Sequence, residues 1–120
     1  MNKKDLEERL INFAVLVIDI TNEMPDKKAA KHLSGQIIRS GTSPALNYGE
    51  AQSAESRKDF VHKMKIVLKE LRETFVCLKI IKRAKLFKTL EKVDRALIEN
   101  NELISIFVKS VETTQRNMKR

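Results

Sequence analysis

Apolar residues recur every three or four positions along almost the whole chain, which is the spacing of one face of an α-helix. The first periodic segment ends at Met24, because Pro25 pushes the residue before it out of the helical region. Asp26 then stands where it could cap the next helix. Further apolar residues widen the stripe of this first segment, so we expect its helix to be buried on more than one side. The stripe itself consists of Leu6, Leu10, Phe13, Val17 and Ile20.

The second segment, from about Lys27 to Ser40, runs into the strongest helix breaker in the chain. The sequence Ser40-Gly41-Thr42-Ser43-Pro44 combines small residues with a proline. Ser43 is a good N-cap and proline is well tolerated at the first position of a helix, so a helix could restart at Pro44. We therefore predict either one long helix with a kink between Gly41 and Pro44, or two collinear pieces.

The third segment opens with a recognisable start signal. Ser56 and Asp59 have the spacing of a capping box, with Asp in the place usually taken by Glu. The apolar stripe that follows could continue unbroken to about Lys85. A helix of that extent has about 30 residues and is roughly 45 Å long, which is considerable for a domain of this size.

The fourth segment begins near Thr89. Asn100-Asn101 interrupts its apolar pattern weakly, and the polar tail from Gln115 to Arg120 is expected to fray. Four amphipathic helices with short connections predict an all-α fold, an antiparallel four-helix bundle in up-down-up-down order. We expect residues 1–120 to form one such domain.

The helices also bear on location and assembly. The apolar run Leu10–Ile18 is flanked by acidic residues and no cleavage site follows it, so it does not resemble a signal peptide. No stretch approaches the roughly 18 uninterrupted apolar residues of a membrane span. We therefore expect a cytoplasmic protein without a membrane partner. The long helices and the excess apolar surface of the first one favour a homo-oligomer.

Charge adds a second feature. The chain has 24 Lys and Arg against 16 Asp and Glu, a net charge of +8. All of this excess lies between Arg57 and Arg95, where 13 basic residues stand against five acidic ones, and the rest of the chain is neutral. A basic region this localised favours a polyanionic partner, RNA or DNA.

Six basic residues of the third segment share one helical face, together with His62. Cations in such a row could follow a phosphate backbone and gain affinity from counterion release. The alternative is a solvated helix face without a ligand. Glu73 could pair with Lys69, four residues earlier. These candidate nucleic-acid-binding residues, here called the basic row, are Lys58, Lys65, Lys69, Arg72, Lys79 and Arg83.

Other kinds of chemistry find little support. His32 and His62 lack a second histidine or carboxylate at ligand spacing, so we expect neither a metal site nor a cofactor. Cys77 lies in an apolar run and is interpreted as a buried thiol. No phosphate-binding loop or nucleophile motif occurs, and we expect no enzyme. Aromatic residues for base stacking are scarce, with Tyr48 the one tyrosine, so binding should be backbone-directed and weakly sequence-specific.

Small and polar residues gather in residues 40–53. Small residues let helices approach closely, and an asparagine there could hydrogen-bond across the contact. We interpret this segment as a site of close packing and a kink, with ligand binding as the alternative. The residues concerned are Gly41, Ser43, Pro44, Asn47 and Tyr48.

Residues 40–81 contain an ordered series of recognisable positions: Gly41, Thr42, Ser43, Asn47, Tyr48, Ser56, Lys58, Asp59, Phe60, Lys63, Lys65, Ile66, Glu70 and Glu73. This series resembles the four-helix-bundle family of 23S rRNA-intervening-sequence proteins. The resemblance implies a homopentamer without established catalytic residues, and some relatives are basic accessory proteins of reverse transcriptases in diversity-generating retroelements. Many members have Ala where this chain has Gly49, so the match to their "N-x-A-E-G" form is incomplete.

Two functions from different classes follow. The favoured one is a non-enzymatic oligomer that binds structured RNA through the basic row. The alternative is a structural or scaffolding homo-oligomer that binds an acidic protein partner, as a reverse-transcriptase accessory protein would. The two hypotheses differ in whether the basic row is exposed in the assembled protein. A nucleic-acid binder needs the row exposed, whereas in a scaffold the row could be buried in salt bridges between subunits.

Overall fold

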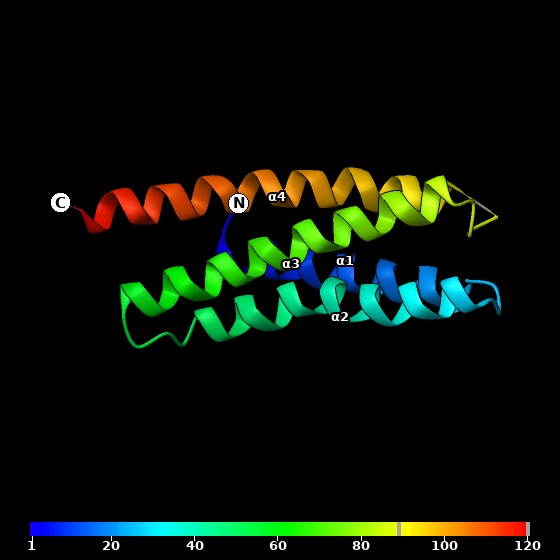
Figure 1. Ribbon diagram of the computed structural model, residues 1–120. Coiled ribbons are helices and arrows are strands. Elements are labelled where there is room, and N and C mark those ends of the chain that lie inside the picture. Colours follow the sequence, from blue (N-terminus) through cyan, green and yellow to red (C-terminus); the bar gives the residue numbers. More distant parts are fainter. Residues whose placement is uncertain (89, 120) are drawn as a thin grey trace.

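The computed structural model describes residues 1–88 and 90–119, and four helices account for most of them (Figure 1). They are α1 (Lys3–Asn22), α2 (Lys28–Ala51), α3 (Arg57–Arg83) and α4 (Leu90–Met118). Short connections at alternate ends of the molecule join consecutive helices, and the described residues contain no strand. The molecule is elongated, 51 × 22 × 21 Å. The predicted all-α four-helix bundle is confirmed.

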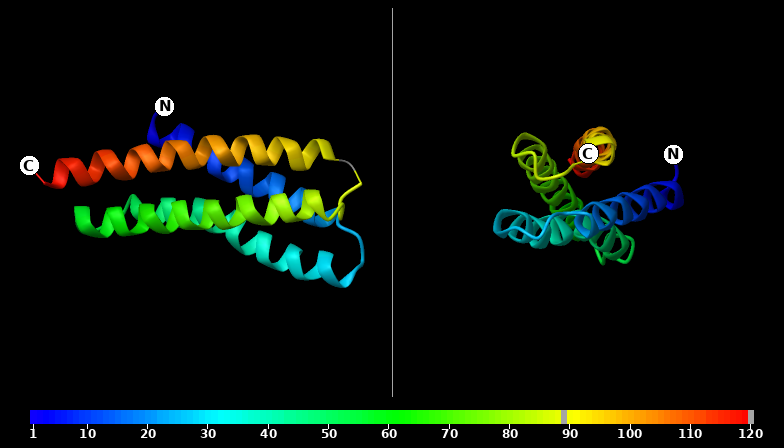
Figure 2. Two further views of the ribbon diagram at one scale, coloured as in Figure 1. Left: turned by 45° about the horizontal axis from the view of Figure 1, so that its top comes forward. Right: turned by 90° about the vertical axis from the view of Figure 1, so that its right-hand side faces the viewer.

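The helices pack in a closed cycle of neighbours. Helix α1 lies against α2 and α4, and α3 lies against the same two helices (Figure 2). Each helix contributes fully buried side chains to one continuous core, for example Phe13, Ile37, Leu71 and Phe107. These positions follow from the apolar stripes, because residues three and four apart share a helix face.

Two helix starts are fixed by side-chain caps. At α1, Asn2 Oδ1 accepts from the Asp5 N–H at 2.9 Å, and the Asp5 carboxylate accepts from the Asn2 N–H. At α3, Ser56 Oγ accepts from the Asp59 N–H at 3.0 Å, as the capping-box spacing predicts. The other half of that box differs, because the Asp59 carboxylate accepts from the N–H of Glu55 at 3.4 Å.

The start of α2 differs from the prediction for Asp26. The helix begins at Lys28, so the cap position falls on Lys27, whose side chain makes no capping bond. Asp26 is one residue too early to cap, and its carboxylate instead pairs with Lys31 at 2.8 Å. The prediction of an Asp26 cap is therefore wrong.

Helix α2 continues through the predicted breaker. Pro44 lies inside the helix and is buried, as is Gly41 one turn earlier. A proline inside a helix costs about 3 kcal/mol because it removes a backbone hydrogen bond and crowds the preceding turn. Here burial of the segment between α1 and α3 outweighs that cost. Two separate pieces with Ser43 as an N-cap are therefore wrong, and a kink between Gly41 and Pro44 stays a prediction.

Helix α4 likewise runs without interruption past Asn100, where the apolar pattern is weakly interrupted. Asn100 is fully buried against α3. Its amide group donates to the carbonyl oxygen of Leu71 and accepts from the N–H of Phe75, both at 3.0 Å. The predicted fraying tail is also helical as far as Met118. The predicted start at Thr89 lies outside the described residues.

Candidate nucleic-acid interface

All six side chains of the basic row are exposed. The residues of α3 that enter the core, such as Val67, Leu71 and Leu78, lie on the other side of the helix. This division follows from the 100° step between helical residues. From Lys58 to Arg83 the row extends over about 37 Å of helix at 1.5 Å per residue. Val76, 55% exposed, is the apolar residue that interrupts it.

The acidic residues beside the row are bound elsewhere. Arg39 of α2 donates from Nη1 to Glu70 Oε2 at 3.1 Å and from Nη2 to the carboxylate of Glu73. The predicted pair between Glu73 and Lys69 is therefore wrong. Arg39 presents a rigid planar fork of donors, and two of its nitrogens each engage one carboxylate.

Two further acids of the basic region are also engaged. The Asp59 carboxylate accepts from a backbone N–H at the start of α3. Asp94 of α4 pairs with Lys82 at 2.7 Å, and Lys82 lies beside the basic row without belonging to it. Across residues 1–88 and 90–119, none of the six row cations forms an ion pair. Much of the positive charge of the region therefore lies unpaired on the exposed face of α3.

One row cation contacts an aromatic ring. The Lys79 ammonium lies 4.6 Å from the centre of the Phe75 ring, which is cation–π distance. Phe75 is partly exposed, so its ring adds a small apolar surface beside the basic row. Both residues line a cleft between the end of α3 and the start of α4.

The small-residue segment lies away from this surface. Gly41 faces α1, and a Cβ atom built on it would lie 2.8 Å from Cγ1 of Val17. Tyr48 is buried, with its ring edge-on to Phe107 at a centroid distance of 5.7 Å. These residues and Pro44 are buried in the core, whereas Ser43 and Asn47 are partly exposed.

Asn47 does not bridge two helices. Its Nδ2 donates to the Ser43 carbonyl oxygen at 3.0 Å and to Ser43 Oγ at 2.8 Å, both within α2. The expectation that it hydrogen-bonds across a helix contact is wrong. A buried polar contact between α2 and α3 is made by Ser40 and Thr74, whose hydroxyl oxygens lie 2.9 Å apart.

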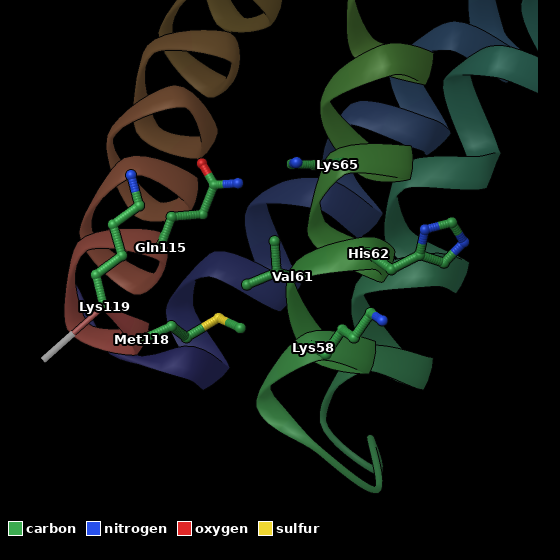
Figure 3. Close-up of a pocket in the computed structure, with 7 residues that line it drawn as sticks. All are labelled: Lys58, Val61, His62, Lys65, Gln115, Met118 and Lys119. Atoms are coloured by element: carbon green, nitrogen blue, oxygen red, sulfur yellow. The ribbon is translucent and has the colours of Figure 1, made fainter.

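A cleft opens where the start of α3 faces the end of α4 (Figure 3). Its volume is about 480 Å³, and its lining includes Lys58 and Lys65 of the basic row. Gln115, Met118 and Lys119 form the α4 side. In Figure 3 Lys65 and Gln115 extend into the gap from opposite helices, whereas the His62 ring points away from α4.

Sequence reasoning missed two elements of this surface. Arg39 is more than 30 positions from both carboxylates that it binds, and no local pattern connects them. The α4 wall of the cleft lies in the tail that was expected to fray. A signal did exist for the tail, since Val108 and Val111 extend the apolar stripe close to Gln115.

Metal and thiol chemistry have little basis in the described part of the chain. No group of three or more His, Cys, Asp or Glu side chains is placed there to hold a metal ion. Cys77 is buried, and burial raises the pKa of its thiol, with the nearby Glu73 charge acting in the same direction. A raised thiol pKa disfavours the reactive thiolate at neutral pH.

Among the described residues, no helix is both long and apolar enough to cross a membrane.

Fold and surface together define an all-α four-helix protein with a row of unpaired cations on one helix. The chain belongs to the family of 23S rRNA-intervening sequence proteins, whose family model matches residues 3–109. No curated protein matches it.

A solved structure extends this similarity to the fold. It is the crystal structure of a protein of unknown function from the S23 ribosomal protein family, from Bacteroides thetaiotaomicron. The two chains are 28% identical with a TM-score of 0.84, over 93% of this chain and 99% of that one. The four-helix arrangement is thus shared with an experimental structure.

Proposed function

We propose that this protein is a non-enzymatic nucleic-acid-binding protein that holds the phosphate backbone of structured RNA along the basic row. The observation that carries the proposal is the state of the row: six exposed cations, none of them in an ion pair within the described residues. Unpaired, hydrated cations can exchange their anions for phosphates without first breaking a protein salt bridge. The family name, which refers to an intervening sequence of 23S rRNA, agrees with an RNA partner.

Arg39 supports this function indirectly. By binding Glu70 and Glu73 it offsets part of the negative charge of the two carboxylates closest to the middle of the row. Without it, Glu73 could turn to Lys69 four residues away, an ordinary helical pair. The charge that phosphates meet is therefore set by α2 as well as by α3.

The test compares RNA affinity in three proteins at low salt by fluorescence anisotropy. The row variant carries Lys65→Gln, Lys69→Gln and Arg72→Gln. The matched control carries Lys4→Gln, Lys28→Gln and Lys109→Gln, three exposed lysines outside the row, so the net charge falls equally. We expect the row variant to lose most of its affinity and the control to lose little. Equal losses would contradict a specific role for the row.

A second function, a scaffolding homo-oligomer, has support of its own. Ile11, Val15 and Ile18 line one face of α1 at helical spacing and are each exposed by 40% or more. An apolar stripe of this kind favours a protein interface. We propose that copies of this chain associate through it, and the family resemblance favours a ring of five. Such a ring would multiply the basic row, so assembly and RNA binding are compatible.

A further inference from the structure

The cleft where the start of α3 faces the end of α4 combines cations of the basic row with apolar side chains. Lys58, Lys65 and Lys119 line it together with an apolar floor. That floor consists of Val61, 6% exposed, and Met118, 40% exposed.

The lining residues suit a particular ligand. The seven residues that form it include no Asp or Glu, so the cleft favours an anion and disfavours a metal ion. A bare phosphate gains no favourable contact from an apolar floor. A nucleobase does gain one, since a methionine sulfur makes favourable contacts with aromatic rings. The Gln115 amide offers both a donor and an acceptor to the edge of a base.

The size and position of the cleft agree with this chemistry. A volume of about 480 Å³ lies within the roughly 300–1,000 Å³ typical of small-ligand sites. Lys58 and Lys65 belong both to the cleft and to the basic row, so a backbone that follows the row leads into it. We propose that this cleft holds one unpaired nucleotide, with the base on Val61 and Met118 and its phosphates at Lys58, Lys65 and Lys119. This inference rests on the proposed function, since the RNA strand reaches the cleft by binding along the basic row.

The experiment separates the base from its phosphates. Anisotropy is measured with three labelled RNA probes: a blunt duplex, the same duplex with a short adenosine overhang, and the same duplex with an abasic overhang of equal length. The abasic strand keeps the phosphates and lacks the bases. We expect the adenosine overhang to bind about fivefold tighter than the abasic one, the order of one sulfur–aromatic contact.

Two variants assign that difference to the cleft. Met118→Ala should abolish the preference for adenosine and leave affinity for the blunt duplex unchanged. Leu46→Ala, which removes a large apolar side chain from an exposed site on α2, should preserve the preference.

The possible failures are distinguishable. Equal affinity for the adenosine and abasic overhangs, with duplex binding intact, would overturn the nucleotide cleft and leave the proposed function standing. Absence of binding to all three probes at low salt would overturn both.

Discussion

Gly41 lies so close to Val17 that helices α1 and α2 can meet there only because the glycine has no side chain. A Cβ atom at position 41 would lie 2.8 and 2.9 Å from the two γ-carbons of Val17. Val17 is itself fully buried, so it has little room to move away. This contact fixes the spacing of the two helices at the point where Pro44 enters the core.

We expect Gly41→Ala to lower the free energy of unfolding by about 1–3 kcal/mol, as overpacking in a core does. Gly35→Ala is the matched control, because a Cβ there meets no atom within 4 Å. That substitution should stabilise the protein by about 0.5–1 kcal/mol, since alanine is the better helix former. Urea unfolding followed by circular dichroism measures both. Stabilisation by both alanines would show that the close contact at Gly41 is unimportant.

Arg39 is expected to stabilise the fold through Glu70, whose side chain is almost wholly buried. Arg39→Ala leaves that carboxylate without its partner and should cost about 1–3 kcal/mol. Adding Glu70→Gln removes the buried charge, so the double variant should regain part of this loss. Thermal unfolding of the two single variants and the double variant forms the cycle. Strictly additive losses would mean that the two side chains are not coupled.

Cys77 should react slowly with thiol reagents in the native protein. Burial raises its thiol pKa above the ordinary value of 9.0, so the thiolate is scarce at neutral pH. The folded state holds its proton more tightly than the unfolded state. The corresponding stability is therefore complete below the ordinary thiol pKa and declines as the pH rises through the raised one. Alkylation rates across a pH series, native against urea-unfolded, measure the effect. Equal rates in the two states would contradict the burial.

Val15 lies at the centre of the exposed α1 stripe, 51% exposed between Ile11 and Ile18. We expect Val15→Lys to shift the protein towards the monomer, because a charge in an apolar interface must be desolvated. Leu46→Lys, an equal change at an exposed apolar site on α2, should leave the assembly intact. Light scattering coupled to gel filtration gives the masses. A wild-type monomer at micromolar concentration would contradict self-association itself.

The helices could be predicted because local rules determine them. Apolar spacing placed all four, and the Ser56 cap placed the start of α3 correctly. The same rules left Pro44 open between one long helix and two pieces, because the penalty of a proline is local whereas its compensation comes from α1 and α3. Asn100 is likewise compensated by another helix. A polar residue on an apolar stripe suggests a break unless its partners on another helix are known.

The surface was predictable to a lesser degree. Helical spacing alone placed the basic row on one exposed face. The ion pairs beside the row could not be predicted, since Glu73 has two possible partners: Lys69, one turn away, and Arg39 on another helix. A guanidinium held between two carboxylates prevails over a flexible lysine pair on an exposed helix. Predicting the α4 side of the cleft required knowing that α4 extends to Met118, and the polar residues of the tail did not indicate this.

The central claim is that the basic row binds phosphates, and the salt dependence of RNA binding tests it most directly. Each phosphate that a cation neutralises contributes about 0.9 to the slope of log affinity against log salt on a duplex. We expect the variant Lys65→Gln, Lys69→Gln, Arg72→Gln to flatten this slope by about two to three, equally for unrelated sequences. The control Lys4→Gln, Lys28→Gln, Lys109→Gln should change the slope by less than about one. A wild-type protein that fails to bind RNA at low salt, or a slope that the row variant leaves unchanged, would contradict the account.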